Sequence, residues 1–268
     1  MKWSGEAMAL SRLMLALAPY RGDLVLVGGW AHRLMRLHPL AQTMDFQPLF
    51  TQDVDLAIPA KIPPQQEDLR TLLLRAGFKE RLLGEVHPPV TRYELEDGAG
   101  FYAEFLTPLV GPPKPPTSEL GGVTAHALRH LDILMIEPWS VLLKEPAYPV
   151  GAKAVEVRVA NATSYVAQKI LALNRRGADG PKDVLYVHDT LITFGRSLTE
   201  IERIWTHDIS PAINPAAGRK LRDAGERLFG EVTDTVREAS RIAKEAGRPL
   251  RPEEIAQVCR TGLARIFT

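Results

Sequence analysis

Two aspartates one residue apart, Asp53 and Asp55, lie in the apolar run 51–58. Residues two apart in a β-strand point to the same face, so both carboxylates would project side by side while Val54 and Leu56 enter the core. Adjacent carboxylates repel each other, and they stay ionised together at little cost only when water or a cation compensates their charge. Because Mg²⁺ prefers carboxylate oxygens, this spacing favours a magnesium site over its alternative, the polar face of an edge strand.

A pair of glycines, Gly28 and Gly29, follows the short apolar run 24–27 and precedes a helical pattern at 31–37. Glycine lets a backbone approach a ligand closely, and the free N–H groups where a helix begins form an anion site suited to phosphate. Phosphates on backbone amides and metal ions on carboxylates form the arrangement of metal-assisted phosphoryl or nucleotidyl transfer. The two motifs together therefore predict that class of chemistry.

A third acidic residue, Glu104, lies in the otherwise apolar run 101–106. That run and 92–95 flank the turn-like sequence 96–100, which predicts an antiparallel hairpin. A carboxylate among apolar strand residues is costly unless something binds it, so Glu104 is a candidate for the same site. Its alternative is a solvated position on a strand close to an exposed turn.

The composition limits other functions. The chain has 268 residues, with 33 Lys and Arg against 32 Asp and Glu, so its overall charge does not point to nucleic acid. Cys259 is the single cysteine, which excludes an internal disulfide and a cysteine-based zinc site within one chain. Every apolar run is broken by charge well short of the ~20 residues of a membrane span, and residues 1–19 are typical of an amphipathic helix rather than a signal peptide. We therefore expect a cytoplasmic protein with no membrane partner.

The hydrophobic periodicity changes near residue 160: strands alternate with helices before it, and the pattern is helical after it. The expected strands are 24–27, 51–58, 92–95, 101–106, 132–136 and 154–159. The expected helices are 8–18, 31–37, 65–76, 161–176, 182–194, 198–206, 216–229, 231–246 and 252–266, with a loop over the site at 38–50 and a stiff proline-rich segment at 111–116. This order predicts an α+β protein, with a mixed sheet and flanking helices in a domain of residues 1–160 and a helical domain of residues 161–268.

These motifs follow one another in an order that resembles a known family. Val27-Gly28-Gly29-Trp30-Ala31, then Thr51-x-Asp53-Val54-Asp55-Leu56, then a strand with Glu104, resemble the catalytic signature of the DNA polymerase β-type nucleotidyltransferase superfamily. The helical sequence 165–173 with Lys169, then Arg175-Arg176, then 182–189 with Asp183, resemble the helix pair of bacterial AbiEii-type toxins and related uncharacterised nucleotidyltransferases. The resemblance covers most of residues 24 to 195.

The resemblance implies a role for each motif. In that superfamily the glycine step holds the triphosphate, the paired aspartates hold two Mg²⁺ ions, and the third carboxylate activates the attacking hydroxyl and shares a metal ion. The corresponding positions are Gly28 and Gly29, Asp53 and Asp55, and Glu104. Thr51, Lys169 and Asp183 complete the nucleotide-binding set. Lys169 would contact the phosphates as a point charge, and Asp183 would hold Lys169 or the substrate in place.

The activity that the resemblance implies is Mg²⁺-dependent transfer of a nucleoside monophosphate from an NTP to a hydroxyl on RNA such as tRNA, on a protein or on a small molecule. The helical domain would close over the nucleotide, and an antitoxin partner would accompany a toxin. Glu104 stands where an aspartate is usual, and Leu49-Phe50 where an arginine is usual. These departures favour the alternative of a catalytically inactive nucleotide- or RNA-binding protein of the same fold. A third reading is a phosphohydrolase, because the same metal pair can activate water.

Overall fold

The computed structural model describes residues 5–49, 51–83, 89–95, 100–109, 117–173 and 180–267. The chain forms two compact units, Met1–Leu37 with Phe50–Ala160 and His38–Leu49 with Asn161–Thr268. None of the helices in the described ranges has the length and apolar character needed to span a membrane.

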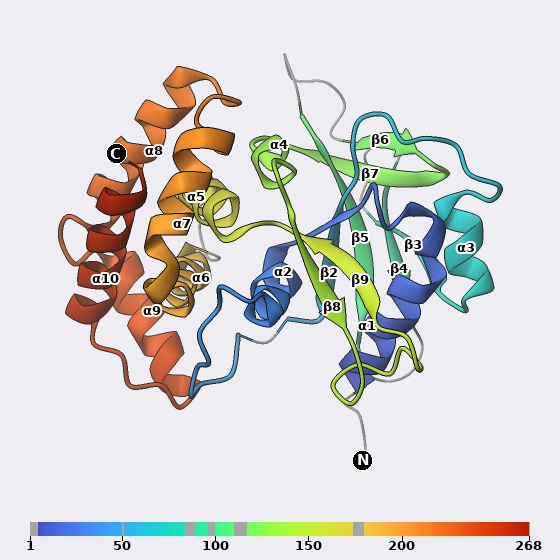
Figure 1. Cartoon of the computed structure of the whole chain (residues 1–268), viewed down its shortest axis with the longest axis horizontal. Helices are drawn as coiled ribbons and strands as arrows, with labels where there is room; N and C mark the ends of the chain where they lie inside the picture. Colours follow the sequence, from blue (N-terminus) through green and yellow to red (C-terminus); the bar gives the residue numbers. More distant parts are fainter. Residues whose placement is uncertain are drawn as a thin grey trace. The chain divides into compact units, whose positions relative to one another are not determined.

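The first unit is built on a mixed sheet, which in the described residues has nine strands. They are β1 Val25–Val27, β2 Asp53–Ala57, β3 Lys79–Leu83, β4 Val90–Glu94, β5 Tyr102–Pro108, β6 Thr117–Leu120, β7 Val123–Leu128, β8 Trp139–Leu143 and β9 Val155–Val159. The sheet order is β3-β4-β5-β2-β1-β9-β8, and β7 joins β5 to β6 (Figure 1). With helices added, this confirms the predicted α+β class.

The centre of the sheet sets the positions of the predicted site residues. Strand β2 pairs antiparallel with β1, where Asp55 lies opposite Val27, and parallel with β5, where Asp55 lies opposite Glu104. Strand β4 pairs antiparallel with the other side of β5, which confirms the predicted hairpin; its turn lies outside the described residues. The sheet therefore brings three sequence-distant segments, β1, β2 and β5, side by side.

The helices of the first unit are short after the first one: α1 Gly5–Ala16, α2 Gly28–Leu34, α3 Leu69–Arg75 and α4 Leu131–Leu134, with 3₁₀ turns at Ala18–Tyr20 and Met35–Leu37. Helix α3 begins after Asp68, whose side chain accepts a hydrogen bond from the Thr71 backbone N–H at 2.7 Å. It ends before Gly77, whose φ of +85° lies in the left-handed region that glycine adopts without strain. The cap at each end explains why this helix is shorter than the predicted 65–76.

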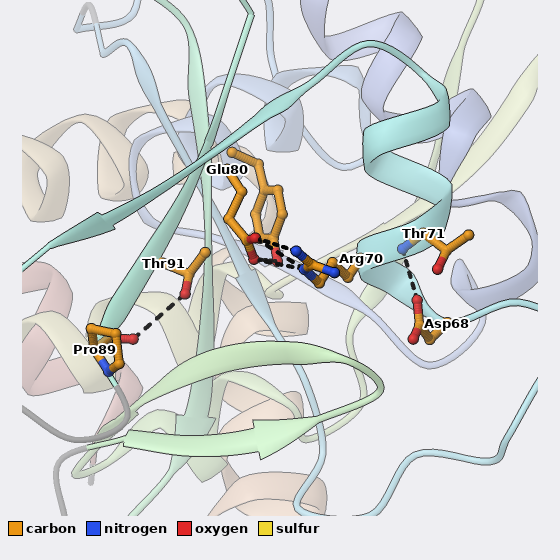
Figure 2. Close-up of polar contacts among 7 residues, drawn as sticks. Asp68, Arg70, Thr71, Glu80, Pro89 and Thr91 are labelled. Carbon is orange, nitrogen blue, oxygen red and sulfur yellow. Dashed lines mark hydrogen bonds and ion pairs between the residues drawn. The ribbon is translucent and has the colours of Figure 1, made fainter.

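Polar contacts attach α3 to the sheet, as Figure 2 shows. The Arg70 guanidinium donates to both carboxylate oxygens of Glu80 at 2.7 to 3.0 Å, and the Tyr93 hydroxyl donates to Glu80 at 3.1 Å. Tyr93 is fully buried, and burial together with the charge of Glu80 raises the pKa of its phenol. Glu80 therefore links a surface helix to a tyrosine in the sheet.

The second unit is helical in its described residues. Its helices are α5 Ala162–Leu173, α6 Gly180–Thr193, α7 Leu198–Ile204, α8 Pro215–Phe229, α9 Asp234–Glu245 and α10 Pro252–Ile266, with a 3₁₀ turn at Gly195–Ser197 and a π-helical turn at Trp205–Ile209 (Figure 1). Helices α5 and α6 are buried along most of their length. Asn161 begins α5, because its side-chain oxygen accepts a hydrogen bond from the Ser164 N–H at 2.8 Å.

The segment His38–Leu49, expected as a loop over the site, has no regular structure and groups with the helical unit. The Gln42 amide donates to the Ile192 carbonyl at 2.5 Å, and the Gln42 backbone N–H donates to the Thr193 carbonyl at 2.9 Å. The Ser197 hydroxyl donates to the Leu40 carbonyl at 2.9 Å. Hydrogen bonds to the end of α6 and the turn after it therefore hold this segment.

One predicted strand is wrong. Residues 132–136 do not form a strand, because α4 occupies Leu131–Leu134. A short apolar run has the same composition in a buried helix turn and in a strand, so periodicity does not separate the two. The proline-rich segment 111–116 and Arg175-Arg176 lie outside the described residues.

Candidate active site

The three predicted carboxylates lie on one face of the sheet. Along β2, Val54 and Leu56 are fully buried, whereas Asp53 and Asp55 on the opposite face are half-buried. Along β5, Glu104 is half-buried between fully buried neighbours, and it lies opposite Asp55 in the parallel register. Residues opposite each other in paired strands point to the same face, so the sheet brings all three acids to one surface.

Gly28 lies against this surface. Its φ is +62°, and a Cβ atom added there would lie 2.1 Å from Asp55 Oδ2. The backbone at the start of α2 therefore touches the Asp55 carboxylate at a place where a side chain would collide with it. Gly29 follows in the first turn of α2 and is buried. Both glycines thus lie just after β1, as the sequence predicts, and Gly28 lies beside the acidic face.

Thr51 contacts the other aspartate. Its hydroxyl donates a hydrogen bond to Asp53 Oδ1, and Thr51 is buried two residues before β2 begins. A donor so close in sequence fixes the direction of the carboxylate. In this structure Thr51 therefore orients Asp53.

Glu104 is held by a residue that the sequence analysis missed. Arg92 on β4 lies opposite Glu104 in the antiparallel register, and its Nε atom donates to Glu104 Oε1 in an ion pair. The Arg92 guanidinium also lies 4.3 Å from the centroid of the Tyr102 ring. Burial, followed by the negative charge of Asp53, raises the pKa of Tyr102. Arg92 and Tyr102 therefore belong to the same charged face.

A signal for Arg92 was present in the sequence. Arg92 and Glu104 lie at equal distances along the chain from the centre of the predicted turn 96–100. Equal distances from a hairpin turn place two residues opposite each other with their side chains on one face. The predicted hairpin therefore already implied this pair of opposite charges.

The donor set fits a divalent cation in part. Asp53 and Asp55 offer the two carboxylates with which proteins commonly hold Mg²⁺ next to substrate phosphates. Within the ranges that the structure describes, no group of three or more histidine, cysteine or acidic side chains is arranged to hold a metal ion. The third carboxylate, that of Glu104, forms the ion pair with Arg92 on β4.

Lys169 and Asp183 belong to the helical unit. The Lys169 Nζ atom on α5 donates to Asp183 Oδ1 on α6 at 2.6 Å, and only 5% and 3% of the two side chains are exposed. The same Nζ atom lies 5.5 Å and 5.0 Å from the ring centroids of Tyr165 and Tyr186. This buried pair joins α5 to α6. A contact of Lys169 with substrate phosphates stays a prediction.

Comparison with known proteins identifies the family. The sequence profile of a family described as nucleotidyltransferase matches residues 6–189. The chain belongs to this nucleotidyltransferase family. The matched residues include the glycine pair, the three carboxylates and the Lys169–Asp183 pair of this nucleotidyltransferase. No curated protein sequence matches the chain.

Two solved structures resemble this nucleotidyltransferase at a distance. An antigenic nucleotidyltransferase-like protein from Paracoccidioides brasiliensis has 15% identity and a TM-score of 0.43, over 93% of this chain and 95% of its own. The antibiotic-resistance factor ANT(2'')-Ia has 12% identity and a TM-score of 0.30, over 74% of this chain and 95% of its own. Similarities this distant transfer no property to this nucleotidyltransferase. The likeness to AbiEii-type toxins stays a prediction.

Proposed function

We propose that this nucleotidyltransferase carries out Mg²⁺-dependent transfer of a nucleoside monophosphate from an NTP to a hydroxyl group on RNA, a protein or a small molecule. The observation that carries the proposal is the acidic face, on which Asp53, Asp55 and Glu104 lie in register beside the backbone of Gly28. Family membership supplies the reaction class.

In this proposal each residue has a chemical task. Asp53 and Asp55 would hold two Mg²⁺ ions, one of them shared with Glu104, and these ions would stabilise charge on the attacking and leaving oxygens. The acceptor oxygen forms a bond to the α-phosphorus as the bond from that phosphorus to pyrophosphate breaks. Glu104 takes the proton of the acceptor hydroxyl. Gly28 and Gly29 would cradle the phosphates, and Lys169, held by Asp183, would contact them.

The test uses radiolabelled NTPs, Mg²⁺ and separate pools of RNA, protein and small-molecule hydroxyl acceptors. We expect label in one pool with release of pyrophosphate. Asp53→Asn and Asp55→Asn remove one charge each from the metal site at almost constant volume, so each variant should lose at least about a hundredfold of the transfer rate. Circular dichroism and thermal melting would show that both variants fold.

Asp132→Asn is the matched control, because Asp132 is an exposed aspartate of α4 in the same unit. It should transfer label at the wild-type rate. Label in none of the pools, or equal transfer by Asp53→Asn and wild type, would refute the proposed activity. Free phosphate or pyrophosphate formed without any acceptor would instead identify a phosphohydrolase.

A catalytically inactive nucleotide- or RNA-binding protein is the second candidate. The ion pair of Glu104 with Arg92 favours it, because a paired carboxylate is not free to accept a proton. Isothermal titration separates the two candidates. Mg²⁺-dependent NTP binding that releases no pyrophosphate with any acceptor would select the inactive protein.

The proposal extends to a toxin–antitoxin context in the cytoplasm, which rests on the AbiEii-type resemblance. Expression of the chain alone should then slow bacterial growth, and co-expression of the adjacent gene should restore it. The Asp55→Asn variant should be harmless in the same assay. Growth inhibition that persists in this variant would disconnect toxicity from the acidic face.

A further inference from the structure

Glu104 lies between two neighbours of opposite charge. On one side β5 pairs with β2, which places Asp55 opposite Glu104, and on the other side β5 pairs with β4, which places Arg92 opposite Glu104. Paired strands lie about 4.8 Å apart, so a glutamate side chain can extend to either side. In the structure it extends to Arg92, the partner of opposite charge.

The additional methylene group of glutamate allows the carboxylate to reach β4. An aspartate at position 104 would hold its carboxylate close to its own strand, whereas the longer side chain reaches across to β4. A glutamate stands at position 104 in place of the usual aspartate, and Arg92 lies opposite it on the next strand. The two features therefore belong together, because the longer side chain allows the ion pair. The Tyr102 ring under the guanidinium keeps Arg92 over this face.

The pair is weak enough to separate. The side chains of Arg92 and Glu104 are 36% and 18% exposed, so water screens their attraction and can solvate both groups when they part. Two divalent ions on Asp53 and Asp55 would present far more positive charge to Glu104 than one guanidinium does. Metal binding and the ion pair would therefore compete for the same carboxylate.

We propose that Arg92 is a positioning residue that holds Glu104 away from the aspartate pair and releases it to the metal site only as metal ions bind. This inference rests on the proposed function. The three acids share one face, and in the described residues they are not arranged as a three-carboxylate metal group.

The test measures Mn²⁺ binding to the full chain without nucleotide, from the electron paramagnetic resonance signal of free Mn²⁺. Arg92→Gln removes the competitor, so Mn²⁺ should bind about fivefold more tightly than to wild type. Arg92→Lys keeps a charge that can reach Glu104 and should stay near wild type. Arg92→Met, which keeps the aliphatic stem against Tyr102, replaces Arg92→Gln if thermal melting shows that the glutamine variant does not fold.

A double-mutant cycle separates competition from a general charge effect. Removing any nearby cation strengthens metal binding through space, whether or not Glu104 takes part. In the Glu104→Gln background the competition no longer exists, so adding Arg92→Gln should strengthen Mn²⁺ binding only by the through-space effect, and therefore by clearly less than it does in the wild-type background. An equal gain in both backgrounds would overturn the proposal, as would an Arg92→Gln variant that binds Mn²⁺ no more tightly than wild type.

Asp55→Asn distinguishes failure of this inference from failure of the proposed function. Loss of most Mn²⁺ affinity in Asp55→Asn, with no effect of Arg92→Gln, would refute the role of Arg92 and leave the metal site intact. Wild-type Mn²⁺ affinity in Asp55→Asn would refute the metal site itself, and the role of Arg92 with it.

Discussion

At Gly28 both the positive φ angle and the position of the Asp55 carboxylate require a residue without a side chain. A φ of +62° costs a residue with a Cβ atom roughly 1–2 kcal/mol, and the added methyl group would lie 2.1 Å from Asp55 Oδ2. We expect Gly28→Ala to lower the free energy of unfolding by at least about 2 kcal/mol, because strain and the displaced carboxylate add together. Urea denaturation measures this loss, and Mn²⁺ binding should weaken in parallel.

Gly22→Ala is the control for this prediction. No atom lies within 4 Å of the Cβ position at Gly22, a glycine of the same unit that precedes β1. We expect that variant to match wild type within about 0.5 kcal/mol and to bind Mn²⁺ normally. Equal effects of the two substitutions would show that Gly28 is not specially placed.

Residue-scale prediction succeeded where the signal was local. Asp53 and Asp55 share a face because they lie two apart in a strand, and Gly28 lies beside them because it ends the neighbouring strand. Arg92 was missed because its importance comes from the strand opposite. A lone arginine in a hairpin is usually solvated, and only its register with Glu104 makes it part of the site.

At the scale of elements, α3 depends on its N-cap. Asp68 is mostly exposed, and the hydrogen bonds from Thr71 lower the pKa of its carboxyl below the ordinary 3.8. We expect Asp68→Ala to lower the free energy of unfolding by about 1 kcal/mol at pH 7. Since the folded state lowers this pKa, the stabilisation is complete above pH 3.8 and is lost as the pH falls through the folded-state value. The loss of unfolding free energy caused by Asp68→Ala should therefore become smaller below pH 3.8.

Asp68→Asn tests the cause of that effect. Asparagine also caps helices but carries no titrating charge, so this variant should be more stable than Asp68→Ala by a margin that does not change between pH 7 and pH 3. Urea denaturation at several pH values gives both comparisons. A cost of Asp68→Ala that stays constant with pH would contradict the lowered pKa.

The predicted elements were correct where a period was visible. Val155, Val157 and Val159 alternate with polar residues, and β9 occupies that run. Strands β6 and β7 were missed because Thr117–Leu120 is short and mostly polar, and because the apolar positions of Val123–Leu128 are partly filled by alanine, which is a poor strand former. They are defined by pairing with each other and by the pairing of β7 with β5, which no local pattern reveals.

At the scale of the whole molecule, the segment 38–49 shows what the sequence could not reveal. It lies between two strands of the sheet in sequence but groups with the helical unit. Its hydrogen bonds join Leu40 and Gln42 to residues about 150 positions later. Contacts between residues so far apart in the sequence form only in the folded chain. The predicted domains 1–160 and 161–268 are contiguous in sequence, so they place segment 38–49 with the sheet, whereas in the structure it groups with the helical unit.

A buried charge network joins three distant parts of the helical unit. The Arg248 guanidinium donates to both carboxylate oxygens of Asp189 on α6 at 2.7 Å and 2.6 Å, and it lies 3.7 Å from the Phe46 ring centroid. Asp189 also meets His188 Nδ1 at 2.9 Å, and its side chain is fully buried. Arg248 therefore connects segment 38–49, α6 and the loop before α10.

We expect Arg248→Met to lower the free energy of unfolding by about 3–5 kcal/mol, because it keeps the side-chain volume but leaves a buried carboxylate without its cation. Urea denaturation measures the loss, and hydrogen exchange locates it: protection should fall in α6, α9 and segment 38–49, while the strands of the first unit keep theirs. Arg237→Met is the control, because the Arg237 and Asp234 side chains are 60% and 100% exposed and their ion pair is solvated. An equal loss of protection in the strands of the first unit would mean that the two compact units unfold together. An Arg248→Met variant as stable as wild type would mean that buried Asp189 does not need the Arg248 guanidinium.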